Sequence, residues 1–234
     1  MARTAEGRLL TEQHRVLQLR LRAQALLALQ AIWRGVSPED LAATIGPFAT
    51  AAGLLVLARR RDSAALAGRY FREFRRVEGV PGSFEIAADQ PPGAELATGL
   101  VRGAALSGII NARRAGQSPQ AAAANGFVKA AGAASQLVLG GGRRTILDAI
   151  DADREAQGWQ RVPSGKACAF CSMLVSRGAT YKSEASAGFR GHDHCACGAE
   201  PFYEGSQPLP GAERLRALWN ETGDLNSFRK ALAA

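Results

Sequence analysis

Apolar residues recur at helical spacing through the first part of the chain. Residues 6–34 contain no proline and only one glycine, near the start. Their apolar positions include Leu10, Leu17, Leu21, Ala28 and Ile32. This spacing predicts a long amphipathic helix that ends at Gly35. Ser37-Pro38-Glu39-Asp40 then predicts an N-cap, a first-turn proline and acidic residues that open a second helix.

The next segment raises the question of a membrane span. Residues 41–58 carry no charge and are followed by three arginines, as at the stop-transfer end of a span. However, Gly46-Pro47 interrupts the segment, and its alanine, glycine and threonine outnumber the strongly apolar residues. A buried helix in a bundle is therefore the better interpretation, and no membrane partner is expected.

A second apolar stripe follows, and arginines surround it. Leu66, Tyr70, Phe74 and Val77 share one helical face, which we expect in the core. The arginines of this region lie on other faces: Arg59, Arg60, Arg61, Arg69, Arg72, Arg75 and Arg76. A solvated helix face is the plain interpretation of such a set. The alternative is a basic edge for DNA or an acidic partner.

Glycine and proline punctuate the middle of the chain. Residues 79–93 lack a period and contain several breakers, which predicts a connector between two helical layers. A helix is expected over residues 94–114. Ser118-Pro119 predicts the N-cap and first residue of an alanine-rich helix to about residue 139. Gly140-Gly141-Gly142 is expected to break it as a hinge, with another helix over residues 143–153.

After Gly158 the pattern changes to short runs with β-branched or aromatic residues. Residues 159–162, 180–182 and 199–203 predict a small sheet. The tail, residues 210–234, predicts two short helices. The residues expected to dock it are Leu215, Leu218, Trp219, Leu225 and Phe228.

These elements predict a predominantly helical α+β fold. Residues 1–154 form the helical region, in two layers joined near 79–93. Residues 155–205 form a small α/β module, and residues 206–234 form a helical tail. A module this small buries little apolar surface, which is the situation in which a structural metal replaces missing core.

The composition agrees with a folded chain that binds polyanions. The 234 residues are 47% hydrophobic but only 6% aromatic, which favours closely packed helices. The formal net charge is +8, and nearly all the basic residues are arginine. Arginine pairs well with phosphate, so nucleic acid is a plausible neighbour.

The candidate chemistry is confined to the small module. Cys168-Ala-Phe-Cys171 has the two-residue gap of zinc knuckles and ribbons. His192-Asp193-His194-Cys195-Ala196-Cys197 supplies a second half, so six donors compete for four places. If residues 195–203 are extended, Cys195 and Cys197 point to the same face. We predict a structural zinc site, with disulfides or free thiols as the alternatives; no signal peptide is visible, which favours reduced thiols.

Enzymatic zinc sites fit the sequence less well. The chain has no His-x-Glu motif of a deaminase and no His-Glu-x-x-His motif of a metallopeptidase. The triple glycine is not a phosphate loop, since no Gly-Lys-Ser/Thr follows it. A metal-dependent nuclease using His192, Asp193 and His194 is the remaining catalytic alternative.

The residues from GGGRRTILDAIDADREAQGWQRVP through CAFC to GHDHCACGAEPF resemble the MuF-like minor head proteins of actinobacterial tailed phages. The resemblance covers roughly residues 140–204. The family pairs Cys-x-x-Cys with a later His-x-x-Cys-x-Cys, and these positions fall on Cys168, Cys171, His192, Cys195 and Cys197. His194 is an additional histidine and a possible further ligand.

The resemblance implies a low-copy virion protein, inside the head or at the portal vertex, with no enzymatic activity. Its implied partners are the portal and capsid proteins, and DNA during packaging or ejection. A host zinc-binding regulator of DNA is another alternative. The predicted cofactor is a structural Zn²⁺.

Overall fold

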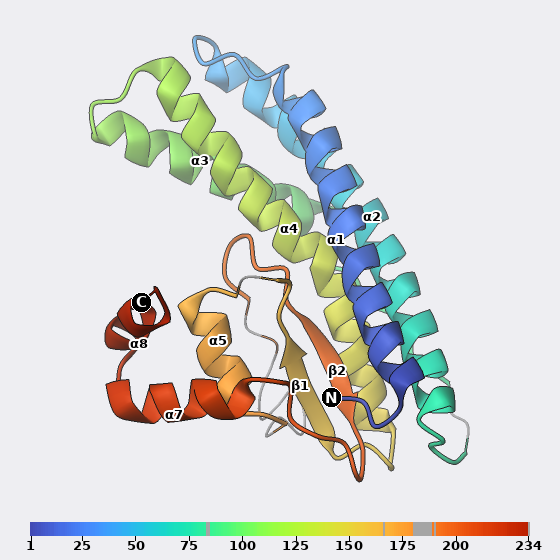
Figure 1. Cartoon of the computed structure of the whole chain (residues 1–234). Coiled ribbons are helices and arrows are strands. Elements are labelled where there is room, and N and C mark those ends of the chain that lie inside the picture. The colour runs from blue at the N-terminus through green and yellow to red at the C-terminus, as the bar shows by residue number, and fades with distance from the viewer. Residues whose placement is uncertain (83–84, 166, 180–188, 190, 234) are drawn as a thin grey trace.

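A computed structural model describes residues 1–82, 85–165, 167–179, 189 and 191–233. Four long helices form an elongated body (Figure 1). They are α1 (Ala5–Trp33), α2 (Leu41–Val77), α3 (Ala94–Arg114) and α4 (Pro119–Ala152). Beside the lower half of α4 lie β1 (Gly158–Val162), α5 (Ala169–Ser176), β2 (Gly198–Phe202), α7 (Ala212–Thr222) and α8 (Leu225–Ala233). The predominantly helical α+β fold is confirmed.

Local capping signals explain two of the helix starts. Ser118 accepts a hydrogen bond from the backbone N–H of Ala121, and Pro119 is the first residue of α4, as predicted. The start of α2 differs from the prediction. Asp40 is its N-cap and accepts from Ala43, while the Ser37 hydroxyl accepts from the Asp40 N–H in the preceding turn. The two polar side chains therefore cap successive turns, and Pro38 lies outside the helix.

The predicted hinge at Gly140-Gly141-Gly142 is wrong, because α4 runs through it without a break. The glycines let α4 approach α2 and α1 closely. A Cβ at Gly142 would lie 2.8 Å from Ser63 Oγ and 2.7 Å from Gln18 Nε2. The Gly142 N–H also donates to Ser63 Oγ. Close packing against two helices thus offsets the poor helix propensity of glycine.

Two main clusters of buried residues hold the molecule together. One lies among the upper halves of the four helices and includes Leu29, Phe48, Val101 and Val138. The other joins α2 and α4 to the module and the tail. Its fully buried members include Phe74, Trp159, Tyr203 and Phe228. The expected boundaries near residues 154 and 205 stay predictions, since one core spans both.

The small sheet has two strands in the described residues. β1 and β2 pair antiparallel, with Gly158 opposite Phe202 and Val162 opposite Gly198. The third predicted strand, residues 180–182, lies outside the described residues. The tail forms two helices as predicted, and Phe228 is buried against the module with Leu215, Leu218, Trp219 and Leu225 around it.

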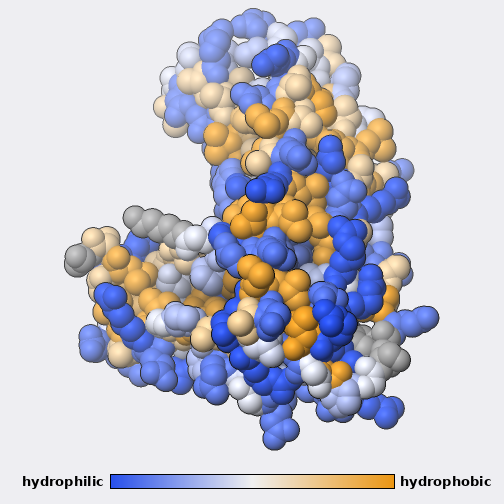
Figure 2. Space-filling model, turned by 45° about the vertical axis from the view of Figure 1, so that its right-hand side comes forward, coloured by the Kyte–Doolittle hydropathy of each residue, from blue (hydrophilic) through white to orange (hydrophobic). Residues whose placement is uncertain are grey.

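Among the residues that the structure describes, one helix is long and apolar enough to cross a membrane by length and composition. This is α2, which has an 18-residue window of mean hydropathy 1.9, a third of it buried. Pro47 is exposed and does not break the helix. The exposed face includes Leu54, and Figure 2 shows apolar residues between hydrophilic ones along this body. A core helix passes the same test, so these features do not assign α2 to a membrane.

Candidate metal centre

The cysteine pair of the module sits at the start of a helix. Cys168 is the N-cap of α5, and its Sγ accepts a hydrogen bond from the backbone N–H of Cys171 at 3.4 Å. The two-residue gap therefore places both sulfurs at the amino end of α5. The positive end of the helix dipole favours thiolates there.

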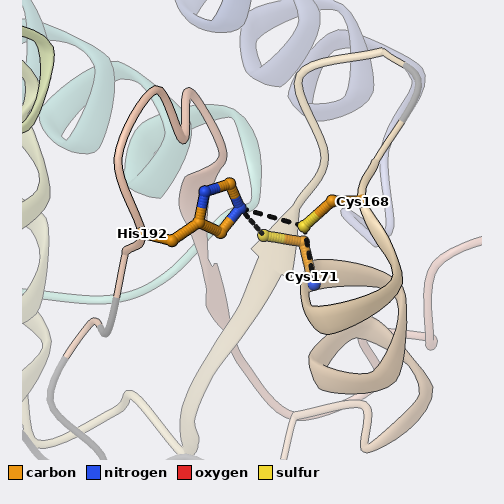
Figure 3. A group of neighbouring side chains, drawn as sticks. All are labelled: Cys168, Cys171 and His192. Carbon is orange, nitrogen blue, oxygen red and sulfur yellow. Dashed lines mark hydrogen bonds between the residues drawn. The ribbon is translucent and has the colours of Figure 1, made fainter. Parts of the chain in front are cut away.

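Cys171 lies at the centre of the five predicted donors, and the other four surround it. Its Sγ lies 3.7 Å from Cys195 Sγ and 3.8 Å from His192 Nε2. Cys168 Sγ lies 2.9 Å from the same His192 nitrogen, and Figure 3 shows the imidazole directed at both sulfurs. Cys171 also forms a compact group with Cys195 and Cys197, whose sulfurs lie within 4.8 Å of one another. Residues from two separate segments thus converge.

These spacings fit a tetrahedral metal site. Two sulfurs bound to one tetrahedral zinc ion lie about 3.8 Å apart, and a sulfur and an imidazole nitrogen about 3.5 Å apart. The separations of Cys171 from Cys195 and His192 agree with these values. Cys168 and His192 are closer, at hydrogen-bond distance. The residues present can therefore hold a thiophilic metal ion.

The backbone turn at residues 192–195 sets the orientation of His192. The Cys195 N–H donates to the His192 carbonyl at 3.0 Å, and His194 adopts a left-handed conformation with φ 64°. His192 Nδ1 lies 2.6 Å from the Asp193 carbonyl oxygen. A carbonyl only accepts, so Nδ1 carries a proton, and in the neutral form of the ring Nε2 presents its lone pair to the sulfurs.

Asp193 and His194 face a different element. Asp193 pairs with Lys129 of α4 at 3.4 Å, and a Cβ at Gly132 of α4 would lie 3.2 Å from His194 Nε2. Within the described chain, neither residue belongs to a group that could hold a metal, whereas His192 does. The structure therefore does not gather His192, Asp193 and His194 as the nuclease alternative requires.

The thiols influence one another strongly. All four cysteines are free in the structure. The hydrogen bond from the Cys171 thiol holds the pKa of Cys195 far below its usual range, and the same contact raises the pKa of Cys171. Burial acts to raise the pKa of Cys168, but hydrogen bonding from Cys171 and the His192 charge lower it overall. The Cys195 thiolate is thus stabilised by the Cys171 thiol, which keeps its proton. A bound cation would allow all the coordinating thiols to ionise.

Arg143 of α4 is a part of the site that sequence reasoning missed. Its guanidinium donates to the Cys195 carbonyl at 2.7 Å and the Cys197 carbonyl at 3.0 Å. It is 7% exposed and lies over the Phe189 ring, with 4.6 Å to the centroid. Its acceptors are all neutral in the described contacts, so the thiolate cluster is the nearby anionic charge. The signal that could have identified Arg143 was the presence of an arginine at the buried, apolar end of α4.

The seven arginines predicted as a basic edge do not form one surface. Arg60 and Arg75 are buried and pair with Asp89 at 2.7 Å and Asp153 at 2.8 Å. Arg59 and Arg76 pair with Asp62 and Glu73. Arg61, Arg69 and Arg72 are exposed and line one groove. Only part of the predicted set therefore presents free charge to solvent.

Comparison with known proteins places this chain among phage proteins. A family model described as VG15 protein matches residues 8–222. The Gene 15 protein of Mycobacterium phage D29 is 35% identical over 38% of this chain and 27% of its own length. The Gene 15 protein of Mycobacterium phage L5 is 32% identical over 38% of this chain and 28% of its own length. The match thus spans little more than a quarter of either relative. No solved structure matches the chain.

Proposed function

Because the chain belongs to the VG15 protein family and matches two mycobacteriophage proteins, we propose that it is a minor head protein of a tailed phage. The family and the relatives support a phage protein. The finer assignment, to the head interior or the portal vertex, comes from the resemblance to MuF-like proteins. In this role the chain assembles with the portal and capsid proteins and is present in the virion.

The convergence of the motif residues is the observation that carries the proposal. The MuF-like signature consists of Cys168, Cys171, His192, Cys195 and Cys197, and these donors meet in one cluster. They come from two segments separated by twenty residues, so their meeting is a property of the fold. A signature whose members converge supports the family resemblance better than the spacing alone.

We propose Zn²⁺ as the metal, in a structural role. Zinc prefers closed tetrahedral sites of thiolates and imidazole, and the buried thiols of Cys171, Cys195 and Cys197 offer such a site. When bound, zinc would supply the cross-link between the start of α5 and the segment before β2. His192 or Cys168 then completes the set, with Cys171 common to both choices.

The metal would stabilise a small module by linking two of its segments. In its described residues, the module has one pair of five-residue strands and the eight-residue α5. Fixing the module against α4 presents one rigid face to a partner. We therefore propose an assembly role without catalysis, outside the membrane.

Virion analysis tests this function. In a phage that encodes the chain, an early stop codon in its gene is complemented from a plasmid by the parent or by Cys171→Ser. We expect mass spectrometry of purified particles to find the parent chain at low copy beside the portal protein. We expect few infectious particles without it. Normal virions that lack the chain would overturn the minor head role.

Plasmid nicking with magnesium, manganese or zinc separates this proposal from the nuclease. We expect no cleavage by the parent above that of His194→Ala, since His194 lies against α4 and apart from the thiols. Cleavage that the parent performs and His194→Ala does not would favour a nuclease. Neighbouring portal and capsid genes would distinguish the phage role from that of a host regulator.

A further inference from the structure

A groove of about 540 Å³ runs along the outer face of α2. Its other wall is the segment that connects α2 to α3, including Ile86, Ala88 and Pro91. The helix contributes the small residues Ala64, Ala65 and Gly68 to the floor. The groove is lined by three exposed arginines, Arg61, Arg69 and Arg72.

These three arginines keep their charge available. Among the described residues, none of them forms an ion pair, and Asp89, the acidic residue of the groove lining, is already engaged. Asp89 is bound by Arg60 through two hydrogen bonds, of 2.7 and 2.8 Å. Asp62 pairs with Arg59, and Glu73 pairs with Arg76. The groove therefore carries a net positive charge that its own surroundings do not neutralise.

The arginines also lie along a line. Arg61 and Arg72 are eleven residues apart, which is about 16 Å along a helix and nearly the same angular position. Arg69 lies between them on the adjacent face. Over about 16 Å, one strand of duplex DNA carries about five phosphates. The spacing of the cations thus suits a regular linear polyanion.

We propose that this arginine groove binds the phosphate backbone of double-stranded DNA, without reading its sequence. The proposal deepens the DNA contact of the proposed function and rests on it for the choice of DNA. Guanidinium groups bind phosphate oxygens through paired N–H donors. Apart from the arginines, the lining is mostly small and apolar and offers few groups that could read base edges.

A matched pair of double variants tests the groove. Arg61→Gln/Arg72→Gln removes two groove charges, and Arg102→Gln/Arg114→Gln removes two exposed charges from α3, outside the groove. Binding to a random-sequence 30-base-pair duplex is measured by fluorescence anisotropy between 50 and 200 mM salt. We expect the groove variant to raise Kd roughly tenfold and to lower the slope of log K against log salt by about 1.8. The α3 variant should change Kd less than about threefold.

Three outcomes would overturn the proposal. They are equal losses in both variants, no binding by the parent at 50 mM salt, and competition by polyglutamate as strong as that by DNA, which would favour an acidic protein. Thermal melts check that both variants fold. Incorporation into virions separates this proposal from the minor head role. If Arg61→Gln/Arg72→Gln enters heads and the parent protein does not bind DNA, the groove proposal is refuted and the minor head role is left intact.

Discussion

The guanidinium of Arg143 donates a hydrogen bond to the carbonyl oxygen of Cys195 over 2.7 Å. A second bond from the same side chain, to the Cys197 carbonyl, fixes the backbone on both sides of Ala196. α4 thereby positions two of the four thiols before any metal binds. The buried positive charge also lies beside a cluster that becomes anionic when its thiols ionise.

Replacing Arg143 is therefore expected to weaken metal binding. We expect Arg143→Met to lower zinc affinity about 10- to 100-fold, the range for residues that orient metal ligands. Arg144→Gln is the control, because Arg144 is the exposed neighbour that pairs with Asp148. Competition with a chromophoric chelator measures the affinity. Equal zinc affinity for the parent and Arg143→Met would contradict a positioning role for Arg143.

Cys171 is expected to be the ligand whose loss costs most. It belongs to both groups of donors, whereas Cys168 belongs only to one. We expect elemental analysis to find one zinc per parent chain and none in Cys171→Ser, with a lower melting temperature. His194→Ala should keep its zinc, because His194 faces α4. A parent chain without metal, or metal loss in His194→Ala, would refute this ligand set.

The ligand types could be predicted from the sequence, but their surroundings could not. Cys-x-x-Cys and His-x-x-Cys-x-Cys are local patterns, and local geometry directs their side chains. Arg143 lies 52 residues from Cys195, and its role depends on how α4 packs on the module. The same holds for the arginines of α2, where the acids that neutralise Arg60 and Arg75 are distant in sequence.

The glycines of α4 give a stability prediction. We expect Gly142→Ala to destabilise the fold by about 1–3 kcal/mol, because the new methyl group would overlap Ser63 and Gln18. Gly103→Ala in α3 is the control, since a Cβ there meets nothing within 4 Å. It should stabilise the fold by up to about 1 kcal/mol through helix propensity. Urea denaturation measures both, and a neutral Gly142→Ala would contradict the close packing.

The start and the middle of α4 show which parts of the fold can be predicted from the sequence. Ser118-Pro119 marks a helix start because capping is a contact over three residues. Gly140-Gly141-Gly142 predicts a break by the same local rule, yet the helix continues. The overriding contact, between Gly142 and Ser63, joins residues 79 positions apart. In α4 the local signal therefore predicts the start of the helix and fails where the helix meets α2.

His14 is expected to make stability depend on pH. It is 8% exposed, stacks on Tyr70 with ring centroids 4.4 Å apart, and lines a cavity of about 30 Å³ with Arg15 and Arg143. Burial lowers its pKa to about 4, from an ordinary value of 6.5. Between these values the unfolded chain binds a proton that the folded chain does not, so stability falls as the pH drops through this window.

The expected loss from His14 between pH 7 and pH 5 is about 2 kcal/mol. The measured quantity is a difference between two proteins, which removes the pH effects that they share. Urea denaturation of the parent and of His14→Phe at both pH values isolates it, because phenylalanine can keep the stacking on Tyr70 but takes no proton. The parent should lose about 2 kcal/mol more than His14→Phe. Equal losses would mean that His14 is protonated in the folded chain as readily as in the unfolded chain, in spite of its burial.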